Sequence, residues 1–89
     1  MSRASKRHMD RVASLGCILC REIGFNDTPA EIHHVFDTAA RSDFLTIPLC
    51  PIHHRCPKRG FHGLGQRAFE AQYGTSEAKL LALTIEALA

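Results

Sequence analysis

The spacing of apolar residues in the first third of this 89-residue chain predicts a helix followed by a turn and a loop. Residues 4–15 are mostly polar but carry a partial apolar stripe at helical spacing, so we expect an N-terminal helix there. Gly16 is a favourable end for this helix, because glycine readily adopts the left-handed conformation that follows many helices. A tight turn at residues 17–20 and a loop at residues 21–29 are predicted to follow.

Two short strands are predicted in the middle of the chain. Residues 30–36 alternate loosely between apolar and polar and contain β-branched side chains. Because side chains alternate across a strand, the neighbours His33 and His34 should point to opposite faces. A polar loop at residues 37–46 then precedes the second strand, at residues 46–49.

The last third of the chain reads as helices separated by a loop. Pro51 suits the first position of a helix, where its missing N–H is not needed. Glycines and a proline break up residues 56–64, and a helix is expected from residue 64 to residue 73. A final helix should begin after a cap at Thr75 or Ser76, with its core-facing side formed by Leu81, Ile85 and Leu88. These elements predict the α+β class.

Length and composition limit the kinds of protein that this chain can be. A domain of 89 residues buries too little surface to have a large stability reserve, so a structural metal would help it to fold. The absence of Trp argues against a broad aromatic platform for stacking bases. No apolar segment follows the polar and basic start, and no run is long enough to cross a membrane. We therefore expect one soluble, cytoplasmic domain over residues 1–89 that does not interact with membranes.

Cysteine and histidine carry the candidate chemistry. All four cysteines and five of the six histidines occur at the spacings of metal ligands, as Cys17-x-x-Cys20, His33-His34, Cys50-x-x-His53-His54, Cys56 and His62. Thiolate and imidazole together suit Zn²⁺, and in a reducing compartment such a pattern favours zinc over disulfides. Because one tetrahedral zinc takes only four ligands, the surplus histidines point to further metal chemistry.

The charge is unevenly distributed along the chain. Residues 1–67 contain ten Lys and Arg against six Asp and Glu, whereas residues 68–89 contain one Lys against three Glu. One basic cluster is N-terminal, and a second surrounds the later histidines and comprises Arg55, Lys58, Arg59 and Arg67. Basic residues around a metal site suit a phosphate substrate, although an ordinary solvated surface is the alternative.

The order of these elements and ligands resembles the HNH endonucleases, also called the ββα-metal nucleases. The similarity covers residues 17–74 and rests on the upstream Cys17-x-x-Cys20, on Ile32-His33-His34-Val35 and on the segment from Ile47 to His54. The run from Pro48 to His54, the later Gly60-Phe61-His62 and Phe69 with Tyr73-Gly74 are most similar to the phage recombination-enhancement, RecA-dependent branch.

The resemblance implies a zinc-stabilised ββα-metal fold with flanking N- and C-terminal helices, encoded by a phage or prophage. It implies a DNA endonuclease or nickase, with a recombinase filament as a further partner. The structural zinc would be held by Cys17, Cys20, Cys50 and His53. His33, His54 and His62 would hold a catalytic divalent metal (Mg²⁺, Mn²⁺ or Zn²⁺), and His34 would be the general base.

Several alternatives stay open on the sequence alone. Cys56 could replace His53 in the zinc site, His34 could be a core histidine, and His62 could be a plain loop residue. The family's base-orienting Asn has no counterpart just before Cys50, so Thr46 or a backbone carbonyl would have to orient His34. The alternative functions are a zinc-stabilised DNA-binding module without catalysis, in which the histidines would not converge, and a protein-interaction module that docks through its acidic C-terminal helix.

Overall fold

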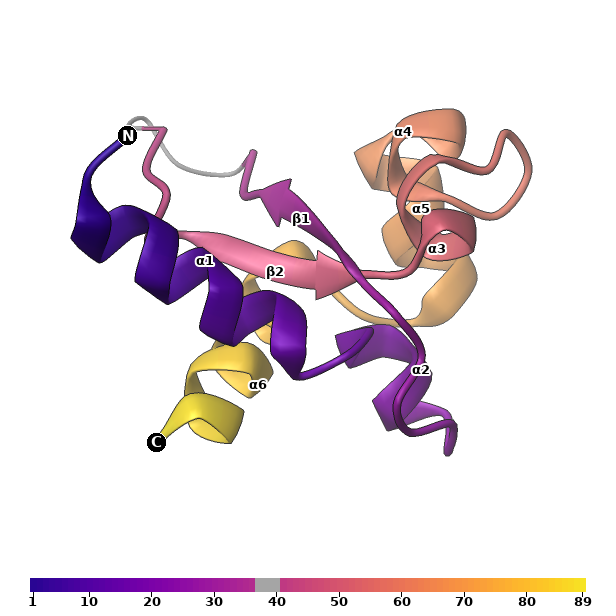
Figure 1. Cartoon of the computed structure of the whole chain (residues 1–89). Helices are drawn as coiled ribbons and strands as arrows, with labels where there is room; N and C mark the ends of the chain where they lie inside the picture. The colour runs from indigo at the N-terminus through magenta and orange to yellow at the C-terminus, as the bar shows by residue number, and fades with distance from the viewer. Residues whose placement is uncertain (37–40) are drawn as a thin grey trace.

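The computed structural model describes residues 1–36 and 41–89 of the chain, which form a two-stranded sheet surrounded by helices (Figure 1). The elements are α1 (Arg3–Ser14), α2 (Ile18–Glu22), β1 (Glu31–His34), β2 (Thr46–Leu49), α3 (Pro51–Arg55), α4 (Phe61–Leu64), α5 (Gln66–Tyr73) and α6 (Glu77–Leu88). The predicted α+β class is confirmed. Of the loop predicted at residues 37–46, residues 37–40 lie outside the described residues, and 41–45 contain neither helix nor strand.

The sheet is a single antiparallel pair of β1 and β2, in which His33 lies opposite Ile47. His33 and Val35 are buried whereas His34 is partly exposed, so the predicted alternation of the two histidines is confirmed. Every residue of β2 is buried, because α1, α2 and α6 all pack against this strand (Figure 1). The core between them contains Val12, Ile18, Leu19, Val35, Ile47, Leu49, Phe61, Phe69 and Leu80.

Helix boundaries follow the predictions where one residue's chemistry decides them. Pro51 occupies the first turn of α3, and the Ser76 hydroxyl accepts a hydrogen bond from the Lys79 N–H at the start of α6. Gly16 and Gly74 have φ values of +76° and +62°, which only glycine adopts at little cost. These glycines follow α1 and α5, where the sequence predicts that helices end.

Two short helices and one helix face differ from the predictions. Residues 18–22, expected as a turn and loop, form α2, and residues 61–64, expected as loop, form α4. The buried side of α6 contains Glu77, Leu80 and Thr84, whereas Ile85 is 53% exposed. The apolar pattern missed this face because two of its three buried residues are polar. Glu77 accepts a hydrogen bond from the Phe36 N–H, and the Thr84 hydroxyl donates to the Leu80 carbonyl within the same helix.

None of the helices in the described part of the chain is long and apolar enough to cross a membrane.

Two candidate metal centres

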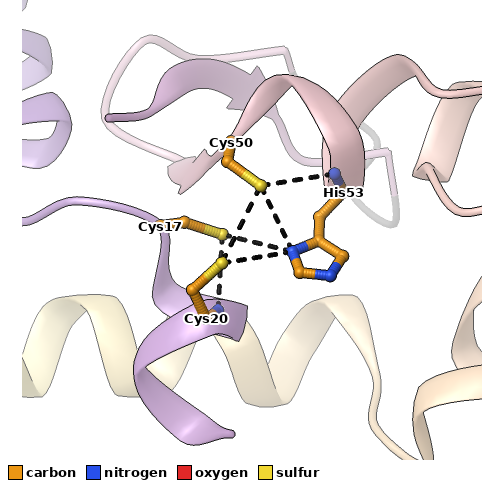
Figure 2. A group of neighbouring side chains, drawn as sticks. All are labelled: Cys17, Cys20, Cys50 and His53. Atoms are coloured by element: carbon orange, nitrogen blue, oxygen red, sulfur yellow. Dashed lines mark hydrogen bonds between the residues drawn. The ribbon is translucent and has the colours of Figure 1, made fainter. Parts of the chain in front are cut away.

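The first candidate centre joins two half-sites, each at the start of a short helix (Figure 2). Cys17 is the N-cap of α2, and its Sγ accepts a hydrogen bond from the Cys20 N–H at 3.4 Å. Cys50 is the N-cap of α3, and its Sγ accepts from the His53 N–H, also at 3.4 Å. The two-residue gap therefore places both ligand side chains of each half-site on one side of a helix N-terminus.

The spacing of these four side chains fits a tetrahedral ion. His53 Nδ1 lies 3.6, 3.5 and 3.3 Å from the sulfurs of Cys17, Cys20 and Cys50, and the sulfurs of Cys20 and Cys50 are 3.8 Å apart. Zinc bonds of about 2.3 Å to sulfur and about 2.05 Å to nitrogen give tetrahedron edges of about 3.8 Å between sulfurs and about 3.6 Å between sulfur and nitrogen. All four cysteines of the chain are free thiols. The group can thus hold a metal such as zinc.

The surroundings of this centre favour a bound cation. Cys17, Cys20 and Cys50 are buried, and burial raises the pKa of the Cys17 thiol to about 12. A buried thiolate needs a positive charge nearby, which a divalent metal supplies. Burial also lowers the pKa of His53, so its imidazole is neutral and keeps a lone pair for a metal.

Packing fixes His53 rather than Cys56 as the fourth member of the group. The ring of Tyr73 packs edge-on against the His53 ring at 5.2 Å, and its hydroxyl donates to the Arg59 carbonyl at 2.6 Å. Cys56 is only half-buried, caps the opposite end of α3 from Cys50, and is not among the four grouped residues. The geometry therefore does not favour the alternative in which Cys56 replaces His53.

The second candidate centre brings together His33, His54 and His62, which come from β1, α3 and α4. One ring nitrogen of each lies within 4.8 Å of the others. Burial lowers the pKa of both His33 and His62, which keeps their imidazoles neutral. A group of three imidazoles can bind Zn²⁺ and other divalent transition metals.

Two of these histidines are hydrogen-bonded to carboxylates. His33 Nε2 donates to Glu77 at 2.7 Å, and His54 Nδ1 donates to Glu31 at 2.9 Å. Because a neutral imidazole has one N–H, the lone pairs are left on His33 Nδ1 and His54 Nε2. The Nδ1 atom of His33 is buried and has no hydrogen-bond partner among the described residues. Such a nitrogen inside a histidine cluster fits a metal ligand, and carboxylates commonly orient metal-binding histidines in this way.

Two glycines place His62 beside His54. A Cβ atom on Gly63 would lie 2.1 Å from the Cys56 carbonyl oxygen, and one on Gly60 would lie 2.6 Å from the Cys56 nitrogen. The backbone of α4 therefore approaches the end of α3 more closely than any side chain would allow. His62 is exposed, but it belongs to this close-packed helix rather than to a plain loop.

His34, the predicted general base, lies outside the group of three. Its Nε2 atom donates to the Asp43 carboxylate at 2.8 Å, and this contact lowers the pKa of Asp43. The side chain of His34 is 21% exposed, so it is not a core residue. The expected partner, Thr46, instead donates from its hydroxyl to the Asp43 backbone carbonyl at 3.1 Å. The side chain that contacts His34 is therefore the Asp43 carboxylate and not the Thr46 hydroxyl.

The predicted DNA-binding residues Arg55, Lys58, Arg59 and Arg67 all have exposed side chains. Arg55 donates to both carboxylate oxygens of Glu31, at 2.8–3.0 Å, and with His54 it lowers the pKa of Glu31 to about 2. Its charge is thus partly neutralised within the protein. The other three are the better candidates for phosphate contacts.

The sequence did not reveal the carboxylates that support the histidines. Glu77, Glu31 and Asp43 lie 44, 23 and 9 residues from the histidines that they contact. Helical or strand spacing cannot indicate such distant pairs. Glu77 showed only the general preference of acidic residues for the first turn of a helix.

Comparison with known protein families gives a match. A family model described as "recombination enhancement, RecA-dependent nuclease" matches residues 2–89, which is nearly the whole chain. No curated protein matches it.

Proposed function

The chain belongs to the recombination-enhancement, RecA-dependent nuclease family, and on this premise we propose that it is a metal-dependent DNA endonuclease or nickase of the HNH type. The observation that carries the proposal is the convergence of His33, His54 and His62 beside a separate group of three cysteines and His53. A zinc-stabilised DNA-binding module would need only the group that contains the cysteines. The resemblance to the phage branch supports a phage or prophage origin.

In this proposal the two centres have different roles. Cys17, Cys20, Cys50 and His53 hold a structural zinc that ties α2 to α3 and so closes the loop between them. His33, His54 and His62 would hold the catalytic ion. A divalent ion bound there would supply a positive charge that stabilises the scissile phosphate and the leaving oxygen.

His34 is proposed to take the proton from the attacking water. With Nε2–H donated to Asp43, Nδ1 carries the lone pair that accepts the proton. Contact with His34 lowers the pKa of Asp43, so this carboxylate is ionised at neutral pH and stabilises the protonated ring that forms. His34 and Asp43 then act as a base and its orienting group.

Two measurements test this function on the unmodified chain. Metal analysis should find two metal ions per chain, and supercoiled plasmid should be nicked or linearised in the presence of Mg²⁺, Mn²⁺ or Zn²⁺. Because the family is described as RecA-dependent, the assay is run with and without a RecA filament on the DNA. One ion per chain and intact plasmid under every condition would favour the alternative, a DNA-binding module without catalysis.

Lys58 and Arg59, two exposed basic residues between His54 and His62 in the sequence, predict how DNA binding depends on salt. Replacing Lys58 and Arg59 together by alanine should weaken binding about equally for all sequences, because phosphate contacts do not read bases. The slope of log affinity against log salt should become less steep by about 1.8, at roughly 0.9 per lost phosphate contact. The matched control is Arg3→Ala with Arg7→Ala on α1, which removes the same charge from another surface. A change in slope only in the control would place the DNA on α1.

A further inference from the structure

Glu77 is a fully buried carboxylate at the first turn of α6. Burying a charge is costly unless hydrogen bonds compensate it. The carboxylate of Glu77 accepts the Nε2–H of His33 at 2.7 Å and the backbone N–H of Phe36 at 2.8 Å. Both of these contacts are to residues 33–36, at the end of β1 and just beyond it.

The contact with Glu77 determines which nitrogen of His33 keeps a lone pair. With Nε2 as the donor, the lone pair is on Nδ1, which is buried and has no hydrogen-bond partner in the described part of the chain. The His33 ring lies 5.4 Å from that of His54 and 5.3 Å from that of His62. The opposite tautomer would place two hydrogen-bond acceptors, Nε2 and the carboxylate, against each other in a buried site.

We infer that Glu77 is a positioning residue of the second metal centre, which fixes His33 in the tautomer and orientation that present Nδ1 to a divalent metal. This inference rests on the proposed function, because it requires that His33, His54 and His62 bind an ion. The start of α6 is itself held in place, since the Glu77 N–H donates to the Glu70 carboxylate at 2.6 Å. The last helix, expected to serve as core or as a docking surface, thus supplies part of the metal centre.

The wild-type chain provides the first test. Nitrogen-15 NMR of the histidine side chains is recorded on protein whose four-residue group is filled with zinc and whose second centre is empty. His33 should carry its proton on Nε2, with Nδ1 unprotonated. A ring protonated on Nδ1 would overturn the inference, and this test does not depend on the folding of any variant.

The second test removes the charge but keeps the shape of the side chain. Co²⁺ is titrated into the zinc-filled protein, and binding is followed by calorimetry and by the absorption of the bound ion. Glu77→Gln should weaken binding about 10–100-fold, the usual effect of losing a hydrogen-bond partner of a metal ligand. Glu86→Gln is the matched control, since it removes an exposed charge from the last turn of the same helix, and its affinity should equal that of the wild type.

The possible results separate this inference from the proposed function. If wild-type protein binds no second ion, the proposed catalytic centre is wrong. If wild type and Glu77→Gln bind the second ion equally well, only the role of Glu77 is wrong. If Glu77→Gln loses its cooperative thermal unfolding, its metal affinity cannot be compared with that of the wild type. The role of Glu77 is then accepted or rejected on the NMR result for wild-type His33.

Discussion

Replacing His34 by alanine is expected to slow DNA cleavage by about 10²–10⁴-fold, the usual contribution of a general base. The expected loss is specific to the chemical step. His34 contacts Asp43 and belongs to neither of the two candidate metal centres. The variant should therefore keep both metals and bind DNA with unchanged affinity. Cleavage is read from supercoiled plasmid, and metal content from mass spectrometry of the intact protein.

Two further histidine variants make this result specific. His62→Ala removes an exposed proposed ligand without leaving a carboxylate unpaired, so it should lose the second ion together with cleavage. His8→Ala removes a half-buried ring that packs on Phe44 and should retain both. The assignment of His34 fails if His34→Ala cuts like the wild type, or if it loses metal that His62→Ala retains.

Replacing Cys20 by alanine is expected to abolish the cooperative fold. Structural zinc contributes an apparent binding free energy of about 10–16 kcal/mol in zinc-finger peptides, which is as large as the entire stability of a typical domain, about 5–15 kcal/mol. Without the Cys20 thiolate only three members of the group remain, so a zinc ion would be held weakly and the buried Cys17 and Cys50 would lose their charge partner. Thermal unfolding followed by circular dichroism should lose its sharp transition.

Cys56→Ala is the control for this experiment. It also removes a thiol, but one that is half-buried and outside the group, so it should keep its zinc and change the free energy of unfolding by no more than about 1 kcal/mol. A Cys20→Ala protein with the stability and metal content of the wild type would show that the four-residue group is not a structural zinc site.

The elements that the sequence predicts well are those in which a single side chain decides the backbone. Pro51, Gly74 and Ser76 act within one turn of the chain, so α3, α5 and α6 begin or end where expected. By contrast, α2 and α4 depend on distant contacts. Helix α2 begins at Cys17, and its half-site meets Cys50 and His53 from a distant part of the sequence. Gly63 allows α4 to pack closely against residues 56 and 57. Local propensity does not report such packing.

The same distinction holds for the site. Metal ligands come from a few residue types with characteristic spacings, so the two groups of side chains that the structure brings together match the predicted sets. Their identity as ligands remains a prediction. The supporting carboxylates could not be predicted, because acidic residues occur throughout the chain and only tertiary packing selects Glu77, Glu31 and Asp43.

The short helix α3 links the two centres, because His53 belongs to one and its neighbour His54 to the other. If each centre binds an ion, the first ion restricts the position of α3 and so also holds the ligand of the second centre in place. Binding is then thermodynamically coupled: zinc at the cysteines raises the affinity of the histidines, and the reverse holds by the same factor. If both centres bind ions as proposed, loss of zinc from the cysteines would therefore also lower the occupancy of the histidine centre, even with ample Mg²⁺ or Mn²⁺ available.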